Sequence, residues 1–146
     1  MSAKSILVIS DQHAPYHHID TLDFLSAIKK KYKPDTVVNI GDEMDWHSIS
    51  FHDSHPGLYS PSHELVVAKR FFKDLESLFP KQYVMDSNHG SLVFRKATRH
   101  GMPHEIFKSY NHMLGVGKGW SWHEDLVIKA SNGQKIYFCH GKYKDV

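Results

Sequence analysis

The chain has 146 residues, which favours a single domain over residues 1–146, and its 40% hydrophobic content allows a buried core and argues against wholesale disorder. Its formal net charge of +2, from 18 basic and 16 acidic residues, is too balanced to indicate a nucleic-acid binder, whereas thirteen histidines raise the expectation of metal chemistry. The single cysteine, Cys139, excludes an internal disulfide and a multi-cysteine zinc module, and the absence of a signal-like or membrane-spanning apolar stretch predicts a cytoplasmic protein.

The continuous aliphatic run Ile6–Ser10 is typical of a strand that is covered on both faces, and Thr36–Ile40 is predicted as the second strand. The segment between them is predicted to be a helix, with Asp20 or Thr21 available as its N-cap and Pro34 beyond its end. Its apolar residues recur at helical spacing at Leu22, Leu25, Ile28 and Tyr32. Strand, helix and strand together predict a parallel β-α-β unit.

After the second run, residues 46 to 60 form a long irregular stretch of the kind that is functional or mobile in compact domains. Ser60-Pro61 then predicts the start of a second helix, which Pro80 ends. Its buried stripe is expected at Leu65, Ala68, Phe72, Leu75 and Phe79. Gln82–Met85 is predicted as the third strand.

The last third contains two short helical segments and three short β runs. Helices are expected over Ser91–His100 and Pro103–Leu114, the second with Ile106, Tyr110 and Leu114 on one face, and the glycines of residues 115–119 indicate a flexible connection. The β runs are expected at Trp120–His123, Leu126–Ser131 and Lys135–Cys139. Asn132-Gly133 predicts a hairpin between the last two.

Potential metal ligands and catalytic side chains follow the predicted strands. They are Asp11 and His13, then Asp42 and Asp45, then Asn88 and His89, and finally His140. In open α/β sheets, ligands bind outside the carboxyl ends of the strands, so these side chains are expected to meet. The position of Asp42 makes it the expected centre of a metal site.

The blocks Asp11-x-His13, Gly41-Asp42-x-x-Asp45, Asn88-His89 and His140-Gly141 resemble those of the calcineurin-like metallophosphoesterase superfamily. The resemblance spans residues 6 to 141. It implies an α/β fold, the αββα sandwich of that family. It also implies metal-dependent hydrolysis of phosphomonoesters or phosphodiesters, with a dinuclear metal centre and a metal-bound hydroxide as the nucleophile.

By this resemblance, Asp42 would bridge two divalent ions. Asp11 and His13 would bind the first ion, and Asn88 and His140 would bind the second. Mixed nitrogen and oxygen ligation suits Mn, Fe or Zn, and the sequence does not choose among them.

The resemblance also implies the roles of the two remaining residues. His89 would donate a proton to the leaving oxygen or hold the phosphate, and Asp45 would accept a hydrogen bond from its other ring nitrogen.

The sequence departs from the family pattern at three points. Ser87 replaces the usual glycine before Asn-His, and Gly90 replaces the usual acidic residue after it, which removes a local carboxylate. No Gly-His-x-His block occurs, so two further histidine ligands are absent. We therefore expect a sandwich whose C-terminal strands are missing, an incomplete metal site, and an exposed sheet edge prone to self-association.

Several alternatives stay open. Arg95, Lys96 and Arg99 indicate a polyanionic substrate such as a nucleotide or nucleic acid, but a solvated helix face explains them equally well. The rival to the enzyme is a non-catalytic binding module that keeps the fold with a degenerate metal site. Six histidines are interpreted as surface residues, with His17 and His47 the best candidates for substrate contacts. These six are His17, His18, His47, His52, His55 and His63.

Overall fold

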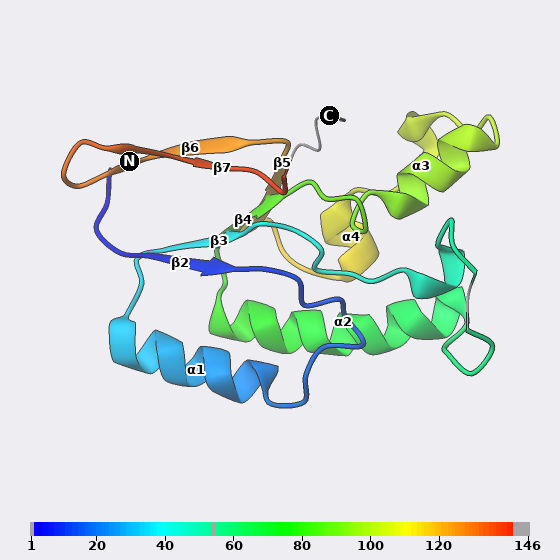
Figure 1. Cartoon of the computed structure of the whole chain (residues 1–146), viewed down its shortest axis with the longest axis horizontal. Coiled ribbons are helices and arrows are strands. Elements are labelled where there is room, and N and C mark those ends of the chain that lie inside the picture. Colours follow the sequence, from blue (N-terminus) through cyan, green and yellow to red (C-terminus); the bar gives the residue numbers. More distant parts are fainter. Residues whose placement is uncertain (1, 54, 142–146) are drawn as a thin grey trace.

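The computed structural model describes residues 2–53 and 55–141, and its largest element is a four-stranded parallel sheet (Figure 1). Its strands, in spatial order, are β2 (Ile6–Ile9), β3 (Thr36–Asn39), β4 (Gln82–Met85) and β5 (Trp120–His123). Each of the three strands predicted for this sheet from the first two thirds of the chain is confirmed to within one residue. Because all four strands are parallel, their carboxyl ends lie along one edge.

A second sheet of three strands packs on one face of the first (Figure 1). It contains β1 (Ser2–Ala3), β6 (Leu126–Ala130) and β7 (Lys135–Phe138), with β6 in the centre. The predicted hairpin between β6 and β7 is confirmed, and Gly133 in its turn has a φ of +88°. The short strand β1, parallel to β6, was not predicted from the sequence.

Neighbouring residues of the central strands point into two different cores. Val37 and Val84 belong to the core beneath the helices, whereas Val38 and Met85 belong to the core between the two sheets. Both faces of the sheet are therefore buried at its central strands, which explains the consecutive apolar residues Val37 and Val38 of β3.

Two helices, α1 (Thr21–Tyr32) and α2 (Pro61–Leu78), cover the other face of the four-stranded sheet (Figure 1). The predicted start of α2 is confirmed, because the Ser60 side chain accepts a hydrogen bond from the backbone N–H of His63 and a proline occupies the first turn. The predicted stripe of α2 is buried except at Leu65, which is partly buried.

The layers therefore run helices, parallel sheet and second sheet, a mixed α/β arrangement that confirms the predicted metallophosphoesterase-like fold. Among residues 2–53 and 55–141, no helix covers the outer face of the second sheet and no strand continues it beyond β7. Self-association through that edge stays a prediction. In the described part of the chain, none of the helices has the length and apolar character that crossing a membrane requires.

The predicted helix over Pro103–Leu114 is wrong as a single element. The chain forms a 3₁₀ turn, η2 (His104–Ile106), and then a separate short helix, α4 (Tyr110–Leu114). Ser109 lies between them in an extended conformation and caps α4 by accepting a hydrogen bond from the backbone of His112. Ile106 is consequently exposed instead of sharing a buried face with Leu114.

Candidate metal centre

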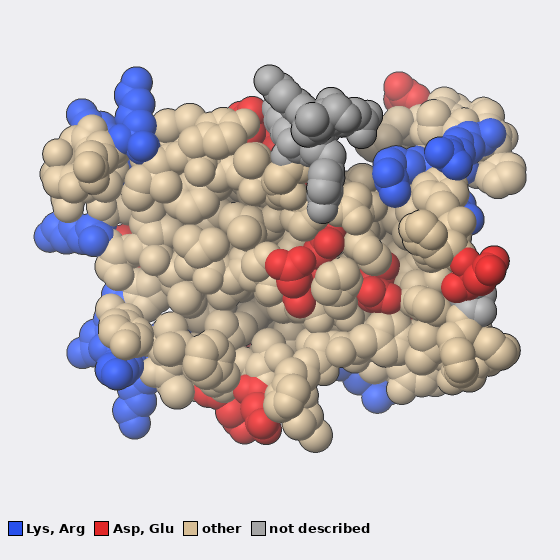
Figure 2. Space-filling model, viewed as in Figure 1, with Lys and Arg blue, Asp and Glu red and all other residues tan. Residues whose placement is uncertain are grey.

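Three of the parallel strands end in polar residues at one edge of the sheet. Figure 2 shows acidic side chains near the middle of one face of the molecule. Asp11 follows β2, Asp42 follows β3, and Asn88 and His89 follow β4. His140 arrives from the second sheet, just after β7. The structure thus brings together residues that are far apart in the sequence, as the strand ends predicted.

The loops after β2 and β3 continue side by side beyond the strands. The backbone N–H groups of Asp11, His13 and Ala14 donate to the carbonyls of Gly41, Asp42 and Glu43 at 3.1, 2.9 and 2.9 Å. This ladder holds the two loops, and the side chains they carry, in fixed register.

Three residues of these loops, Asp11, His13 and Asp42, have positive φ angles of 53°, 45° and 52°. Non-glycine residues rarely adopt this conformation, and such strain tends to gather at functional sites. The backbone here is therefore shaped to aim side chains, at some cost in stability.

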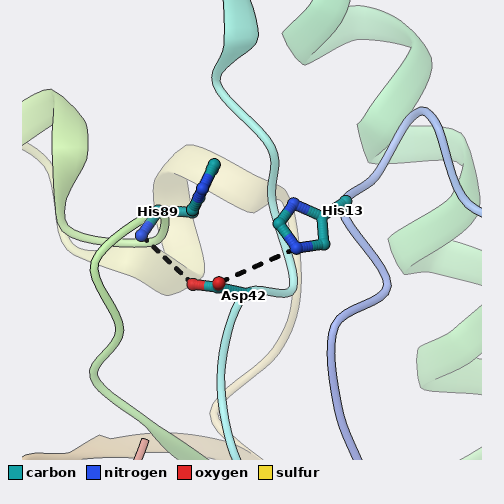
Figure 3. A group of neighbouring side chains, drawn as sticks. All are labelled: His13, Asp42 and His89. Atoms are coloured by element: carbon teal, nitrogen blue, oxygen red, sulfur yellow. Dashed lines mark hydrogen bonds and ion pairs between the residues drawn. The ribbon is translucent and has the colours of Figure 1, made fainter. Parts of the chain in front are cut away.

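Asp42 lies at the centre of the cluster with only 6% of its surface exposed, and its two carboxylate oxygens face different neighbours (Figure 3). Oδ2 lies 3.7 Å from Nε2 of His13. Oδ1 lies 3.2 Å from Nε2 of His140 and accepts a hydrogen bond of 3.1 Å from the backbone N–H of His89. One carboxylate therefore separates two groups of side chains.

On the first side of Asp42, Nδ1 of His13 bonds to the carboxylate of Asp45 at 2.8 Å. This contact leaves Nε2 pointing toward Asp42, with Oδ1 of Asp11 at 3.9 Å. An imidazole held at Nδ1 by a carboxylate is the usual arrangement of a metal-binding histidine.

On the second side, Nδ1 of His140 donates to the carbonyl of Ile40 at 2.7 Å. Nε2 of His140 lies 2.8 Å from Oδ1 of Asn88 and 3.2 Å from Oδ1 of Asp42. These three atoms converge and could all ligate one cation placed between them.

A divalent cation suits both sides of the cluster. Metal–nitrogen and metal–oxygen bonds of about 2.0–2.2 Å place two ligand atoms of one ion about 3–4 Å apart, which is the range of these separations. The donors are carboxylate, imidazole and amide groups, and such a set suits Mn, Fe or Zn. The residues present therefore fit the metal ions that the sequence predicted.

His89 lies beside this cluster, with its ring 4.7 Å from that of His13 in an edge-on arrangement. His13, Asp42 and His89 each offer one ligand atom within 4.8 Å of the others, so His89 is close enough to ligate as well as to act on a substrate.

The expected bond from His89 to the Asp45 carboxylate is not the one that forms. Nδ1 of His89 donates instead to the backbone carbonyl of Asp45 at 2.6 Å, and the carboxylate lies 3.8 Å away because it bonds to His13. Asp45 therefore orients both histidines, one through its side chain and one through its main chain.

Glu43 lies against Gly90, the residue that replaces the usual acidic residue of the family pattern. It is buried, its Oε1 accepts a hydrogen bond from Nε1 of Trp122, and a Cβ atom added at Gly90 would lie 3.0 Å from Oε1. Burial raises the pKa of Glu43 to about 7. The glycine after His89 thus leaves room for an acidic side chain supplied by the neighbouring loop, which sequence reasoning missed.

Ser87, the other departure from the family pattern, holds the turn that carries Asn88 and His89. Its hydroxyl accepts from the backbone N–H of Gly90 at 3.0 Å, and its carbonyl accepts from the backbone and hydroxyl of Ser91. The substitution for glycine is accommodated because the hydroxyl takes part in the turn.

The long loop is anchored by Glu64, a buried residue of α2 that sequence reasoning also missed. Its carboxylate accepts from the backbone N–H groups of His47 and Ser48 and from the hydroxyl of Ser48. Nε2 of His47 in turn accepts a hydrogen bond from the backbone N–H of His55.

His17 stacks on the ring of Phe71 in α2, and burial lowers the pKa of His17.

The model of the calcineurin-like phosphoesterase family matches residues 4–146 of the chain. This range contains all the strand ends that build the cluster around Asp42. A search of curated proteins found none that matches the sequence.

Proposed function

The chain belongs to the calcineurin-like phosphoesterase family, and from this premise we propose that it hydrolyses phosphomonoesters or phosphodiesters at a dinuclear metal site centred on Asp42. The observation that carries the proposal is the position of the Asp42 carboxylate, with one oxygen toward His13 and the other toward His140. A carboxylate so placed can bridge two ions and offset their mutual repulsion.

The ligands divide into two sets that share Asp42. Asp11 and His13 would complete the set for one ion, and Asn88 and His140 the set for the other. Two divalent ions supply the positive charge that stabilises the phosphoryl oxygens and activate a water molecule as the nucleophile.

His89 is proposed as the residue that donates a proton to the leaving oxygen or binds the phosphate. Because Nδ1 is held by the Asp45 carbonyl, the orientation of the ring is fixed and Nε2 is left to face the substrate. General-acid catalysis typically contributes about 10²–10⁴ in rate.

The test is hydrolysis of p-nitrophenyl phosphate and bis-p-nitrophenyl phosphate by protein stripped of metal and then supplied with Mn²⁺, Fe²⁺ or Zn²⁺. We expect no turnover without metal and turnover with at least one ion. The preferred ester distinguishes a phosphatase from a phosphodiesterase. No turnover of either ester with any ion would contradict the proposal.

Replacing His89 by asparagine separates the two roles open to this residue. We expect kcat to fall by about 10²–10⁴ while the number of bound ions stays unchanged. A loss of bound metal in the variant would instead assign His89 to the ligands.

A specific observation favours a second candidate, a binding module that keeps the fold without catalysis. The sequence contains no Gly-His-x-His block, the part of the family pattern that would supply two further histidine ligands. Metal uptake without turnover of any phosphate ester would identify this function.

A further inference from the structure

Three basic side chains of α3 (Leu92–Arg99) gather on the ring of Phe51, in the loop opposite. The charged groups of Arg95, Lys96 and Arg99 lie 5.4, 4.6 and 4.0 Å from the ring centre. We call Phe51 with these three residues the α3 patch. Figure 2 shows basic side chains at the α3 end of the face that carries the acidic centre.

The α3 patch concentrates positive charge that its own contacts do not neutralise. A cation over an exposed aromatic ring gains only about 0.5–1 kcal/mol, and three like charges on one ring also repel each other. Among the described residues, none of the three basic side chains forms an ion pair with a carboxylate. The patch is therefore arranged to receive an external anion.

The patch is continuous with the metal centre. A small pocket of about 70 Å³ is lined by Asn88 and His89 of the metal centre together with Phe51 and Arg95 of the patch. A substrate held at the metal centre would extend directly onto α3.

The extent and chemistry of the patch indicate a chain of nucleotides. The charged groups of Arg95, Lys96 and Arg99 converge on one ring and together carry three positive charges, whereas each phosphodiester of a nucleic acid carries one negative charge, so a ligand with several phosphates in a row matches the patch. Phe51 is 40% exposed and offers an aromatic surface beside the cations. Aromatic rings for bases, combined with basic side chains for phosphates, are the means by which proteins bind single strands without sequence preference.

We propose that the substrate is single-stranded nucleic acid, with the scissile phosphate at the metal centre and the adjoining nucleotides on the α3 patch. This proposal rests on the proposed function for the identity of the reaction, but the binding surface itself can be tested without catalysis.

The experiment measures fluorescence anisotropy of a labelled oligonucleotide of about ten nucleotides, in the presence of EDTA so that no hydrolysis occurs. The test variant carries Arg95→Gln, Lys96→Gln and Arg99→Gln. The matched control carries Lys30→Gln, Lys31→Gln and Lys33→Gln, which also removes three cations. These lie at the C-terminal end of α1, across the molecule from α3 (Figure 1).

Each phosphate contact with a single strand contributes about 0.7 to the slope of log K against log salt concentration, so the α3 variant should lose about 2 from the slope. The control should keep the wild-type slope and affinity. Replacing Phe51 by leucine should weaken binding about tenfold at constant charge, because base stacking is lost.

Equal slopes for the wild type and the α3 variant would overturn the proposal. So would competition by inorganic polyphosphate as strong as by the oligonucleotide, combined with no effect of Phe51→Leu, because the patch would then bind anions of any kind. Binding that depends on α3, in a protein that hydrolyses no ester with any metal, would support the nucleic-acid surface and refute only the proposed hydrolysis.

Discussion

Replacing Gly41 by alanine is expected to disrupt the metal centre by displacing His140. Gly41 has a φ of +104°, and a Cβ atom there would lie 2.6 Å from Cβ of Ser87 and 2.7 Å from Nδ1 of His140. Both distances are well inside van der Waals contact. The added methyl group would therefore push His140 away from the Ile40 carbonyl that orients it.

The expected loss of stability has two parts. An alanine in the left-handed conformation costs about 1–2 kcal/mol, and forcing a methyl group into a packed site costs about 1–3 kcal/mol more. The sum of about 2–5 kcal/mol should lower the Tm by about 10 °C in a chain of this length. The displaced His140 should also weaken metal binding by about 10–100-fold.

Gly133→Ala is the matched control, because Gly133 has a φ of +88° and nothing lies within 4 Å of an added Cβ. It should cost only the backbone part, about 1–2 kcal/mol, and leave Mn²⁺ affinity unchanged. The assays are thermal unfolding followed by circular dichroism and calorimetric titration with Mn²⁺. Equal losses of stability and of metal affinity in the two variants would refute the packing of Gly41 against His140.

Three further predictions follow from other contacts. His140→Ala should leave one bound ion per chain where the wild type binds two, as measured by elemental analysis, and an unchanged count would exclude His140 as a ligand. Glu64→Ala should lower the free energy of unfolding in urea by about 3 kcal/mol, because it leaves three partly buried donors of the loop without their acceptor. Ser48→Ala, which removes one of these donors, should cost about 1 kcal/mol, and comparable losses in the two variants would contradict the anchoring role of Glu64. Because burial lowers the pKa of His17 below its ordinary value near 6.5, the unfolded chain takes up its proton more readily. Stability should therefore fall between about pH 7.5 and 5.5 more in the wild type than in His17→Gln, and parallel urea midpoints would contradict this.

The fold could be predicted largely because its signals are local. The N-cap at Ser60 and the buried stripe of α2 are set by neighbours within a few turns, and the Asn132-Gly133 turn fixes the hairpin. The division of Pro103–Leu114 was missed because a serine with capping geometry at position 109 interrupts an otherwise helical pattern.

The composition of the site could be predicted, but its hydrogen bonds could not. The strand ends indicated which residues meet, since parallel strands end at one edge of the sheet. Whether His13 or His89 bonds to the Asp45 carboxylate depends on loop residues with positive φ. No sequence pattern predicts these angles for Asp11 or His13.

Contacts between segments that are distant in the chain could not be predicted from the sequence either. Glu43 fills the space left by Gly90, and Gly41 packs against His140 about 100 residues away. One signal was available for the first contact: Glu43, an acidic residue, directly follows Asp42, and Gly90 stands where the family pattern has an acidic residue. Recognising it required the distance between the two loops.

The most direct test of the account is the number of Mn²⁺ ions bound per chain before and after Asp42→Asn, with Asp74→Asn as the control. Asp74 is an exposed residue of α2, so its replacement should change nothing. The account predicts two ions in the wild type and the control, and loss of tight binding at both positions in Asp42→Asn, because a single carboxylate serves both. Undiminished uptake by Asp42→Asn would contradict the proposal that Asp42 bridges a dinuclear centre.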